Sequence, residues 1–320
     1  MNRGDWLNRD RIRSAAIVIP FVGLFAVLAI VSPPFLSFVN LTNILDQQST
    51  FLIMAAAGTL VFVAGGIDLS VGAVHALAGV TAAQVTVTAG PVAGMVSGVA
   101  VGLVAGLANG VIVTRFRINA LIATLAVSFV VSGITGLLTG GNLIVILDQT
   151  DFAALARTNI LGLRSSTWIA VVVVLVFAIL LARTIFGRYV YAVGGNPEAA
   201  RLSGVPVRPV RLATFVMSGG AAGLAGVLIA SRVLSAQATS GQDIAFTVLA
   251  GIVVGGTSIA GGEGAVWRTV VGVLFIALIG NGFNLLGFDP LYRQIALGVL
   301  ILGAVGLDAA LRSGRRLAGS

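Results

Sequence analysis

The chain of 320 residues contains no cysteine, no lysine and a single histidine, His75. The lack of cysteine excludes disulfides, thiolate nucleophiles and cysteine-ligated zinc or iron–sulfur sites. One histidine cannot form a histidine-based metal cluster, so we expect no metal and no cofactor. A Walker A loop, GxxxxGK(S/T), needs a lysine to reach the phosphates of ATP. The chain is therefore not expected to hydrolyse ATP by that route, and without a carboxylate pair or serine triad we expect no enzyme.

Charged residues are also scarce, at 9% of the chain against about 25% in soluble proteins. Hydrophobic residues make up 58%, and the mean hydropathy is +1.06. So few charges cannot supply a polar surface, which predicts an integral membrane protein in contact with lipid. The net charge of +8 would suggest a nucleic-acid partner in a soluble protein. In a membrane protein the topology explains it, and we expect no nucleic-acid partner.

The charge-free stretches predict an all-α membrane fold. A helix needs about 20 apolar residues to cross the hydrocarbon core. The chain is expected to form a single transmembrane domain over 14–311, between an N-terminal segment, 1–13, and a tail, 312–320. The region 140–164 is polar and broken by glycine, which predicts a loop. The stretches give ten expected spans: 14–32, 47–67, 69–114 (two spans, divided at Gly90-Pro91), 118–147 (closed at Gly140-Gly141), 165–182, 212–231, 244–262, 269–288 and 291–311.

The arginines predict the orientation. Ten spans put both termini on one side, and that side holds all but four of the 19 basic residues, the exceptions being Arg157, Arg164, Arg232 and Arg293. By the positive-inside rule both termini are cytoplasmic. The basic N-terminus followed by an apolar run also resembles a signal peptide, but no small-residue cleavage site follows it. We therefore expect a retained first span.

Two groups of residues in the spans predict contacts between helices. Four glycines at four-residue spacing share one helix face, which allows another helix to approach closely. Asn281 and Asn284 also share a face. Buried amides of this kind either bond a neighbouring helix or line a wet path, so this pair is a candidate for the translocation path. The four glycines are Gly94, Gly98, Gly102 and Gly106.

The segment GGIDLSVG, residues 65–72, places Asp68 where the second span gives way to the third. An ionisable residue at membrane depth is costly and indicates function by default. Two interpretations stay open. Asp68 caps the helix that follows it at Leu69-Ser70-Val71, or Asp68, Ser70 and His75 contact cargo as path or gate residues. His75 lies about two turns further along on the same face, which adds an Asp–His proton relay as a third hypothesis.

The expected cytoplasmic loop over 183–211 contains a short helix signal. Asn196 is a good cap, and Pro197 fits the first helical position. Gly204 should end the helix, and Pro206 should prevent it from resuming. A short rigid helix on the cytoplasmic face is what a soluble partner would grip, although a solvated basic loop is the simpler alternative.

Four segments resemble the ribose/simple-sugar branch of bacterial ABC importer permeases. They occur in the order GGIDLSVGAV, GRYVYAVGGNPEAARLSGVPV, GGTSIAGGEGAVWRTVVG and NGFNLLG, and the resemblance runs over about 40–305. It implies a type II importer-like bundle of ten helices in the bacterial inner membrane. It also implies a second permease copy in a homo- or heterodimer, a periplasmic sugar-binding protein and cytoplasmic ABC ATPase subunits.

The same resemblance implies which residues couple to the ATPases. The run from Glu198 to Gly204 matches the start of the broader permease motif EAAxxxG. The distal part of that motif, IxLP, is missing, because 214–217 read Thr-Phe-Val-Met. The implied coupling residues are Asn196, Glu198, Ala199, Ala200, Arg201 and Gly204.

Three rival functions remain at this stage. The first is a proton-coupled secondary transporter that uses Asp68 and His75. The second is a passive channel. The third is an importer permease for another small polar solute, such as a branched-chain amino acid or a nucleoside.

Overall fold

The structure is a computed structural model that describes residues 3–241, 243–289, 291–292, 294–296, 298–300, 302–303 and 306. The helices in chain order are α1 (Arg3–Val31), η1 (Pro33–Leu36), α2 (Phe38–Val63), α3 (Val71–Ala89), α4 (Pro91–Arg115), α5 (Ala120–Thr139), α6 (Thr150–Arg157), α7 (Ser165–Arg183), α8 (Ile185–Gly195), α9 (Pro197–Leu202), α10 (Val207–Val233), η2 (Ala238–Gly241), α11 (Ile244–Val254) and α12 (Val266–Leu285). Four two-residue strands form two antiparallel pairs, β1 (Ile144–Val145) with β4 (Ser235–Ala236), and β2 (Asn159–Ile160) with β3 (Leu163–Arg164).

Seven helices within these described residues are long and apolar enough to cross a membrane, namely α2, α3, α4, α5, α7, α10 and α12. They confirm the prediction of an all-α membrane fold. The expected first span falls within α1, where Ile17–Val31 is a shorter apolar stretch. The expected last span, 291–311, lies largely outside the described residues, and the tail 312–320 lies wholly outside them. A total of ten spans therefore stays a prediction.

Turn residues set the helix boundaries that the sequence predicts. Gly90 has a φ of +88° and Pro91 opens α4, so α3 and α4 are separate helices. Gly140 ends α5 in the left-handed conformation, with a φ of +58°. The Leu121 N–H donates to Asn119 Oδ1 at 3.0 Å and caps the start of α5. Glycine adopts positive φ without a steric penalty, and proline needs no N–H partner at a helix start.

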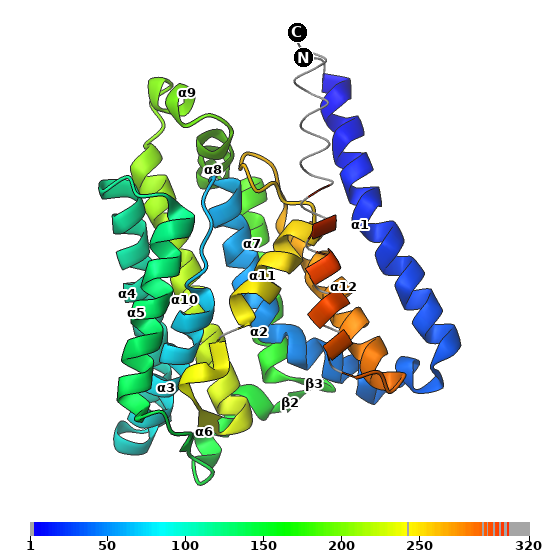
Figure 1. Cartoon of the computed structure of the whole chain (residues 1–320), viewed down its shortest axis with the longest axis vertical. Coiled ribbons are helices and arrows are strands. Elements are labelled where there is room, and N and C mark those ends of the chain that lie inside the picture. The colour runs from blue at the N-terminus through cyan, green and yellow to red at the C-terminus, as the bar shows by residue number, and fades with distance from the viewer. Residues whose placement is uncertain are drawn as a thin grey trace.

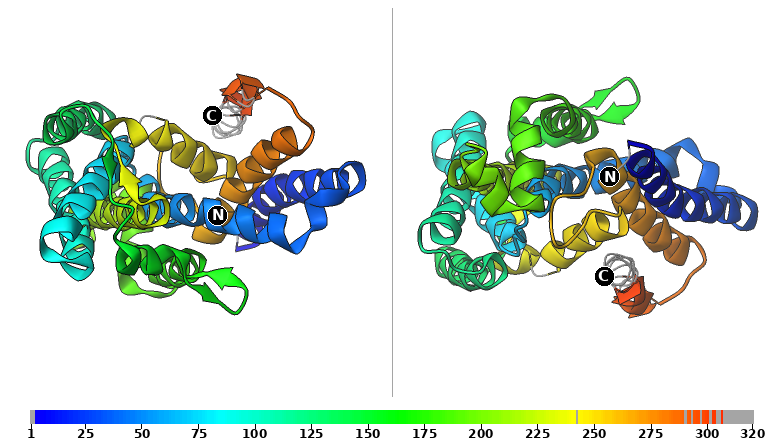
Figure 2. Two further views of the ribbon diagram at one scale, coloured as in Figure 1. Left: turned by 90° about the horizontal axis from the view of Figure 1, so that it is seen from below. Right: turned by 90° about the horizontal axis from the view of Figure 1, so that it is seen from above.

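Helix α2 is the centre of the bundle (Figure 1). It packs on α7, α10, α11 and α12, and α3, α4 and α10 pack closely on one another beside it. Helix α1 packs on α12. Seen from above and below, the bundle is elongated, with α1 at one end and α4 and α5 at the other (Figure 2).

The predicted glycine face of α4 is a helix contact. A Cβ on Gly102 would overlap the Gly219 carbonyl oxygen of α10, and one on Gly106 would overlap the Phe215 carbonyl oxygen. Gly94 and Gly98 meet α3 in the same way. Bare faces let helix backbones approach within membranes, where packing drives association. The stripe therefore fixes α4 against α3 and α10.

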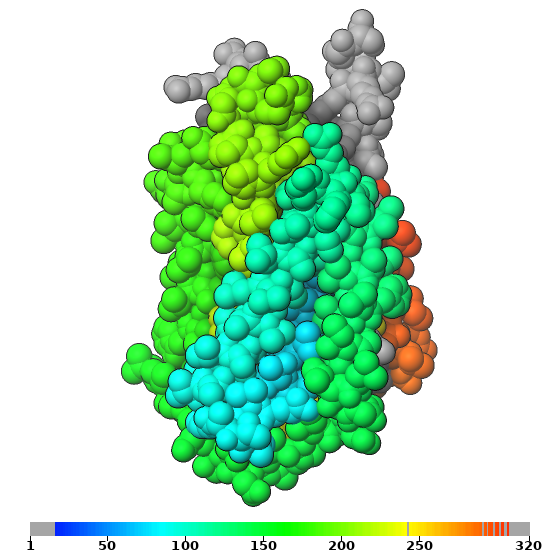
Figure 3. Space-filling model, turned by 90° about the vertical axis from the view of Figure 1, so that its left-hand side faces the viewer, coloured from blue at the N-terminus to red at the C-terminus, as the bar shows by residue number. Residues whose placement is uncertain are grey.

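The opposite side of α4 faces outward together with α5 (Figure 3). The exposed side chains on this side are large and apolar, for example Val104 and Val96 of α4 and Phe129 and Leu137 of α5. Such a surface would be costly in water but fits hydrocarbon. It is the surface expected of helices that face lipid.

Three sequence predictions need correction. The expected loop 140–164 contains helix α6 and three of the short strands. The expected loop 183–211 is mostly helical, because α8 fills its first part and α10 begins directly after Pro206. Helix α9 ends at Leu202 and does not resume, as predicted, but a separate helix, α10, begins directly after Pro206 because proline at a helix start costs no hydrogen bond. The expected span 244–262 is too long, since α11 ends at Val254 and a glycine-rich segment, 255–265, follows.

Candidate functional site

Helix α9 projects from one end of the bundle, beyond α8 (Figure 1). Its start is built as the sequence predicts. Asn196 Oδ1 accepts from the N–H groups of Glu198 at 3.1 Å and Ala199 at 3.0 Å, and Pro197 occupies the first turn. Gly204 follows the helix with a φ of +82°. Both ends of this six-residue helix are therefore fixed by local chemistry.

The face of α9 carries an exposed ion pair. Arg201 Nη2 donates to Glu198 Oε1 at 2.6 Å, and Arg201 Nε donates to Glu198 Oε2 at 3.2 Å. The hydrogen bonds from Arg201, together with its charge, lower the pKa of the Glu198 carboxyl. Glu198 therefore stays ionised at neutral pH. Ala199 and Ala200 lie between the two, and Ala200 is buried in the same apolar cluster as Val193 and Val210.

Three of the singled-out sequence segments meet at the base of α9, in what we call the glycine junction: Gly65, Gly194 with Gly195, and Gly261 with Gly262. The Gly262 N–H donates to the Val63 carbonyl at 2.8 Å. A Cβ on Gly194 would overlap that same carbonyl oxygen, and one on Gly261 would lie 2.7 Å from the Gly65 Cα. The junction joins the end of α8, which leads into α9, to the end of α2 and to the segment before α12.

After Val63 the chain runs back into the bundle before α3 begins at Val71 (Figure 1). Asp68 lies in this stretch and is buried. Its Oδ1 accepts from the Ser70 N–H at 3.0 Å and from Ser70 Oγ at 2.6 Å, and its Oδ2 accepts from Ser218 Oγ at 2.8 Å. Asn109 Nδ2 donates to Ser70 Oγ at 2.7 Å. This buried polar cluster links the break before α3 to α4 and α10.

The prediction that Asp68 caps α3 is wrong. Ser70, not Asp68, occupies the cap position of α3, and the Asp68 carboxylate accepts the N–H of Ser70 itself. The segment is also tied to α5, because the Leu69 N–H donates to Thr124 Oγ1 at 3.0 Å. The role of Asp68 as a path or gate residue stays a prediction.

His75 is buried in α3, and in the described part of the chain its Nδ1 has no hydrogen-bond partner. It lines a cavity of about 90 Å³ together with Gln237 and Ser240. The bonds of Asp68 go to Ser70 and Ser218, and none joins it to His75 within the described residues. The geometry therefore does not assemble the Asp–His relay.

The Asn281 side chain bonds a neighbouring helix. Its Nδ2 donates to Asn40 Oδ1 at 2.8 Å, and Asn40 Nδ2 donates back to Asn281 Oδ1 at 3.2 Å. This reciprocal amide pair ties α12 to the start of α2. Asn284 lies one turn further along α12, and only the backbone hydrogen bonds of its turn are seen among the described contacts. Whether the two amides line a path stays a prediction.

Sequence reasoning missed a second polar cluster, where α2 begins and α10 ends. The buried Asp46 carboxylate lies 3.7 Å from Arg232 Nη1 and 3.6 Å from Arg164 Nε, and it also accepts from Ser166 Oγ. Arg232 Nη1 donates to the Asp46 carbonyl at 2.8 Å. The signal for this site was the charge of these residues at span ends, but nothing local predicts that they pair.

Ser218, which belongs to the cluster around Asp68, was also missed, because one serine in an apolar helix looks like any other.

The sequence is similar to a known protein family and to known permeases. Residues 40–305 match the sequence family described as branched-chain amino acid transport system / permease component. The chain is 41% identical to the ribose import permease protein of Bacillus subtilis (strain 168) over 294 residues, covering 90% of this chain and 91% of that protein. It is 38% identical to the L-arabinose transport system permease protein of Escherichia coli (strain K12) over 302 residues, covering 94% and 92%. No solved structure matches the chain.

Proposed function

The chain belongs to the branched-chain amino acid transport system permease family, and from this membership we propose that it is the membrane-spanning subunit of an ABC importer for a simple sugar. It is a multi-pass protein of the inner membrane, with seven span-length helices among its described residues. The sugar is inferred from the relatives, which are named as ribose and L-arabinose permeases. A transport permease has no reaction of its own to catalyse.

The observation that carries the proposed mechanism is the glycine junction at the base of α9. Cytoplasmic ATPase subunits would bind α9 through Asn196, Glu198 to Arg201, and Gly204. Helix α8 leads directly into α9, and its last residues pack on the junction, Gly194 against Val63 and Gly195 against Gly262. A movement of α9 would therefore be transmitted through α8 to α2 and to the break before α3. Alternating access would then follow from ATP-driven motion, with two permease copies enclosing the path and a periplasmic binding protein delivering the sugar.

The proposal includes a full topology of ten spans within 14–311, with the segments 1–13 and 312–320 in the cytoplasm. The distribution of arginine supports this orientation, because it puts α9 on the basic side. The same arrangement puts the cluster around Asp46 on the periplasmic side, at the opposite end of α2.

The proton-coupled alternative is not favoured, since it rests on a relay between Asp68 and His75 for which the described contacts provide no bond. A passive channel would conduct without any partner. A different cargo, such as a branched-chain amino acid, stays within the same family and would leave the mechanism unchanged.

Charge reversal on α9 tests the docking assignment. Glu198→Arg should abolish ATP-driven uptake in cells while the protein remains in the membrane, because it places two cations on the docking face. The double variant Glu198→Arg with Arg201→Glu keeps an ion pair within α9 and is the matched control. Uptake should stay absent in the double variant if a partner binds the charged face of α9, because the positions of the two charges are exchanged. Wild-type uptake by Glu198→Arg, or full rescue by the double variant, would contradict the assignment.

A further inference from the structure

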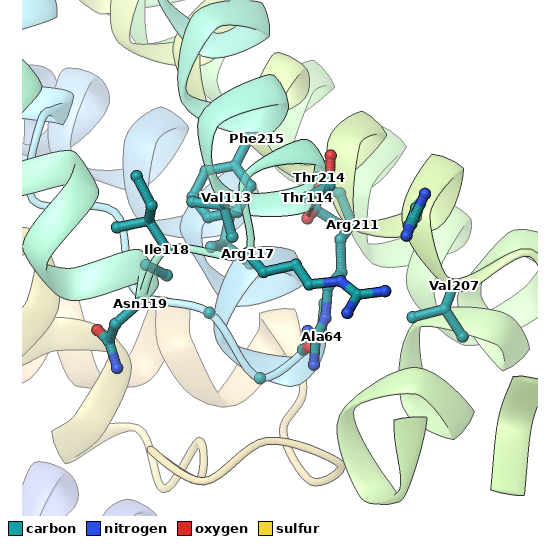
Figure 4. Close-up of a pocket in the computed structure, with 15 residues that line it drawn as sticks. Ala64, Val113, Thr114, Arg117, Ile118, Asn119, Val207, Arg211, Thr214 and Phe215 are labelled. Atoms are coloured by element: carbon teal, nitrogen blue, oxygen red, sulfur yellow. Dashed lines mark hydrogen bonds between the residues drawn. The ribbon is translucent and has the colours of Figure 1, made fainter. Parts of the chain in front are cut away.

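A hollow of about 460 Å³ opens between the end of α2, the end of α4 and the start of α10. Three arginines line it: Arg117 from the turn after α4, and Arg208 and Arg211 from the first turns of α10. Figure 4 shows the Arg117 side chain reaching across the hollow toward Arg211. Nothing in the proposed transport function uses this concentration of charge.

Within the described residues, no carboxylate pairs with the three guanidinium groups. Among the residues that line the hollow there is no aspartate or glutamate, and none of the three arginines forms an ion pair within the described part of the chain. Arg211 Nε donates to the Ala64 carbonyl at 3.3 Å, which leaves its remaining donors available. Three cations converging on one hollow repel one another and raise the local concentration of anions.

The remaining lining adds neutral donors and an apolar wall. The N-terminus of α5, beginning at Ala120, adds the partial positive charge of a helix start, and Asn119 lies beside it. Phe215 and Val113 provide apolar surface on the same hollow. A volume of this size is within the usual range for small-ligand sites, so the hollow can hold an anionic group together with an organic part.

We propose that this hollow binds a phosphate group carried by an organic ligand. Guanidinium groups suit phosphate because their planar forks donate two hydrogen bonds to its oxygens. Three of them match a group with more than one negative charge better than they match a single carboxylate. The phosphate has two available sources, the headgroup of an anionic phospholipid or a soluble phosphate ester.

The test uses the full chain in nanodiscs of phosphatidylcholine alone, with inorganic phosphate titrated against chloride at constant ionic strength. A parallel set contains phosphatidylglycerol without added phosphate. The readouts are the midpoint of thermal unfolding and the lipid retained after delipidation, measured by mass spectrometry. The variants are Arg117→Gln and Arg208→Gln, whose side chains are exposed. Arg115→Gln is the matched control, since Arg115 is exposed at the end of α4 and does not line the hollow.

A soluble source is supported if inorganic phosphate stabilises the wild type, if its apparent affinity falls about tenfold or more in the two pocket variants, and if it is unchanged in Arg115→Gln. Stabilisation and retention of phosphatidylglycerol with the same dependence on the variants supports a lipid source. Equal responses of pocket and control variants would overturn the proposal, as would no response to either probe. Loss of ATPase binding in the pocket variants without any response to phosphate or lipid would also overturn it, because the arginines would then bind a carboxylate of the partner. These readouts involve no transport, so failure here is distinct from failure of the importer assignment.

Discussion

Asp68 is a buried carboxylate whose partners are two serine hydroxyls and one backbone N–H. Such a group stabilises its surroundings by accepting the hydrogen bonds of buried donors. The Ser70 hydroxyl in turn accepts from Asn109, so the loss of one acceptor reaches α4 as well as α10. The break before α3 therefore depends on this side chain.

Asp68→Ala should lower the stability of the folded protein by about 1–3 kcal/mol for each buried donor left without an acceptor. Asp68→Asn should cost less, because its amide oxygen can still accept from Ser70. Thermal unfolding of the purified protein measures both effects. Asp148→Ala, at an exposed aspartate, is the control and should be close to neutral. A wild-type melting temperature for Asp68→Ala would contradict this account of the cluster.

Residue-scale prediction from sequence works where the chemistry is local. Asp68 stood out as an acid at membrane depth, and its bond to Ser70 spans two positions. Its bond to Ser218 spans 150 positions, and no local pattern distinguishes that serine from the others in apolar helices. The amide pair of Asn281 and Asn40 is hidden in the same way, since a lone amide predicts a partner but not which one.

At the scale of elements, the glycine junction lies between α9, the proposed docking surface, and the break between α2 and α3. Gly194 and Gly195 are adjacent but differ in their surroundings. A Cβ at 194 would overlap the Val63 carbonyl, whereas one at 195 would meet nothing within 4 Å. This difference allows a matched comparison within a single turn.

Gly194→Ala should separate α8 from α2 and reduce ATP-driven uptake strongly, since overpacking of this kind costs about 1–3 kcal/mol. Gly195→Ala should transport at close to the wild-type rate. Uptake of labelled sugar, corrected for the amount of protein in the membrane, measures the difference. Equal uptake by the two variants would show that close packing at the junction has no part in coupling.

The elements that sequence predicts best are those whose ends are determined by capping and turn residues next to them in the chain. Helix α9 follows from Asn196, Pro197 and Gly204 because each acts on its own neighbours. The length of α11 does not follow from a charge-free stretch. The absence of charge shows that a segment is compatible with lipid, but it does not show that the whole segment is helical. The glycines after Val254 end that helix, and Gly256 already adopts a φ of +78°.

At the scale of the whole molecule, the proposed topology puts α9 in the cytoplasm and the turn after α5 in the periplasm. The lack of native cysteine makes this easy to test. A membrane-impermeant maleimide should label Asn142→Cys in intact spheroplasts, and it should label Ser203→Cys only after the membrane is opened. Both positions are exposed. The reverse pattern would invert the orientation and remove α9 from the side where ATPases act.

The proposed mechanism rests on an energy source outside the chain, namely ATP hydrolysis by partner ATPase subunits. Gentle detergent extraction from native membranes, followed by affinity capture of the chain and mass spectrometry of everything retained, tests this most directly. We predict that an ABC ATPase co-purifies in stoichiometric amount, and a second, different permease would identify a heterodimer. Recovery of the chain alone, under conditions that preserve other membrane complexes, would contradict the importer assignment.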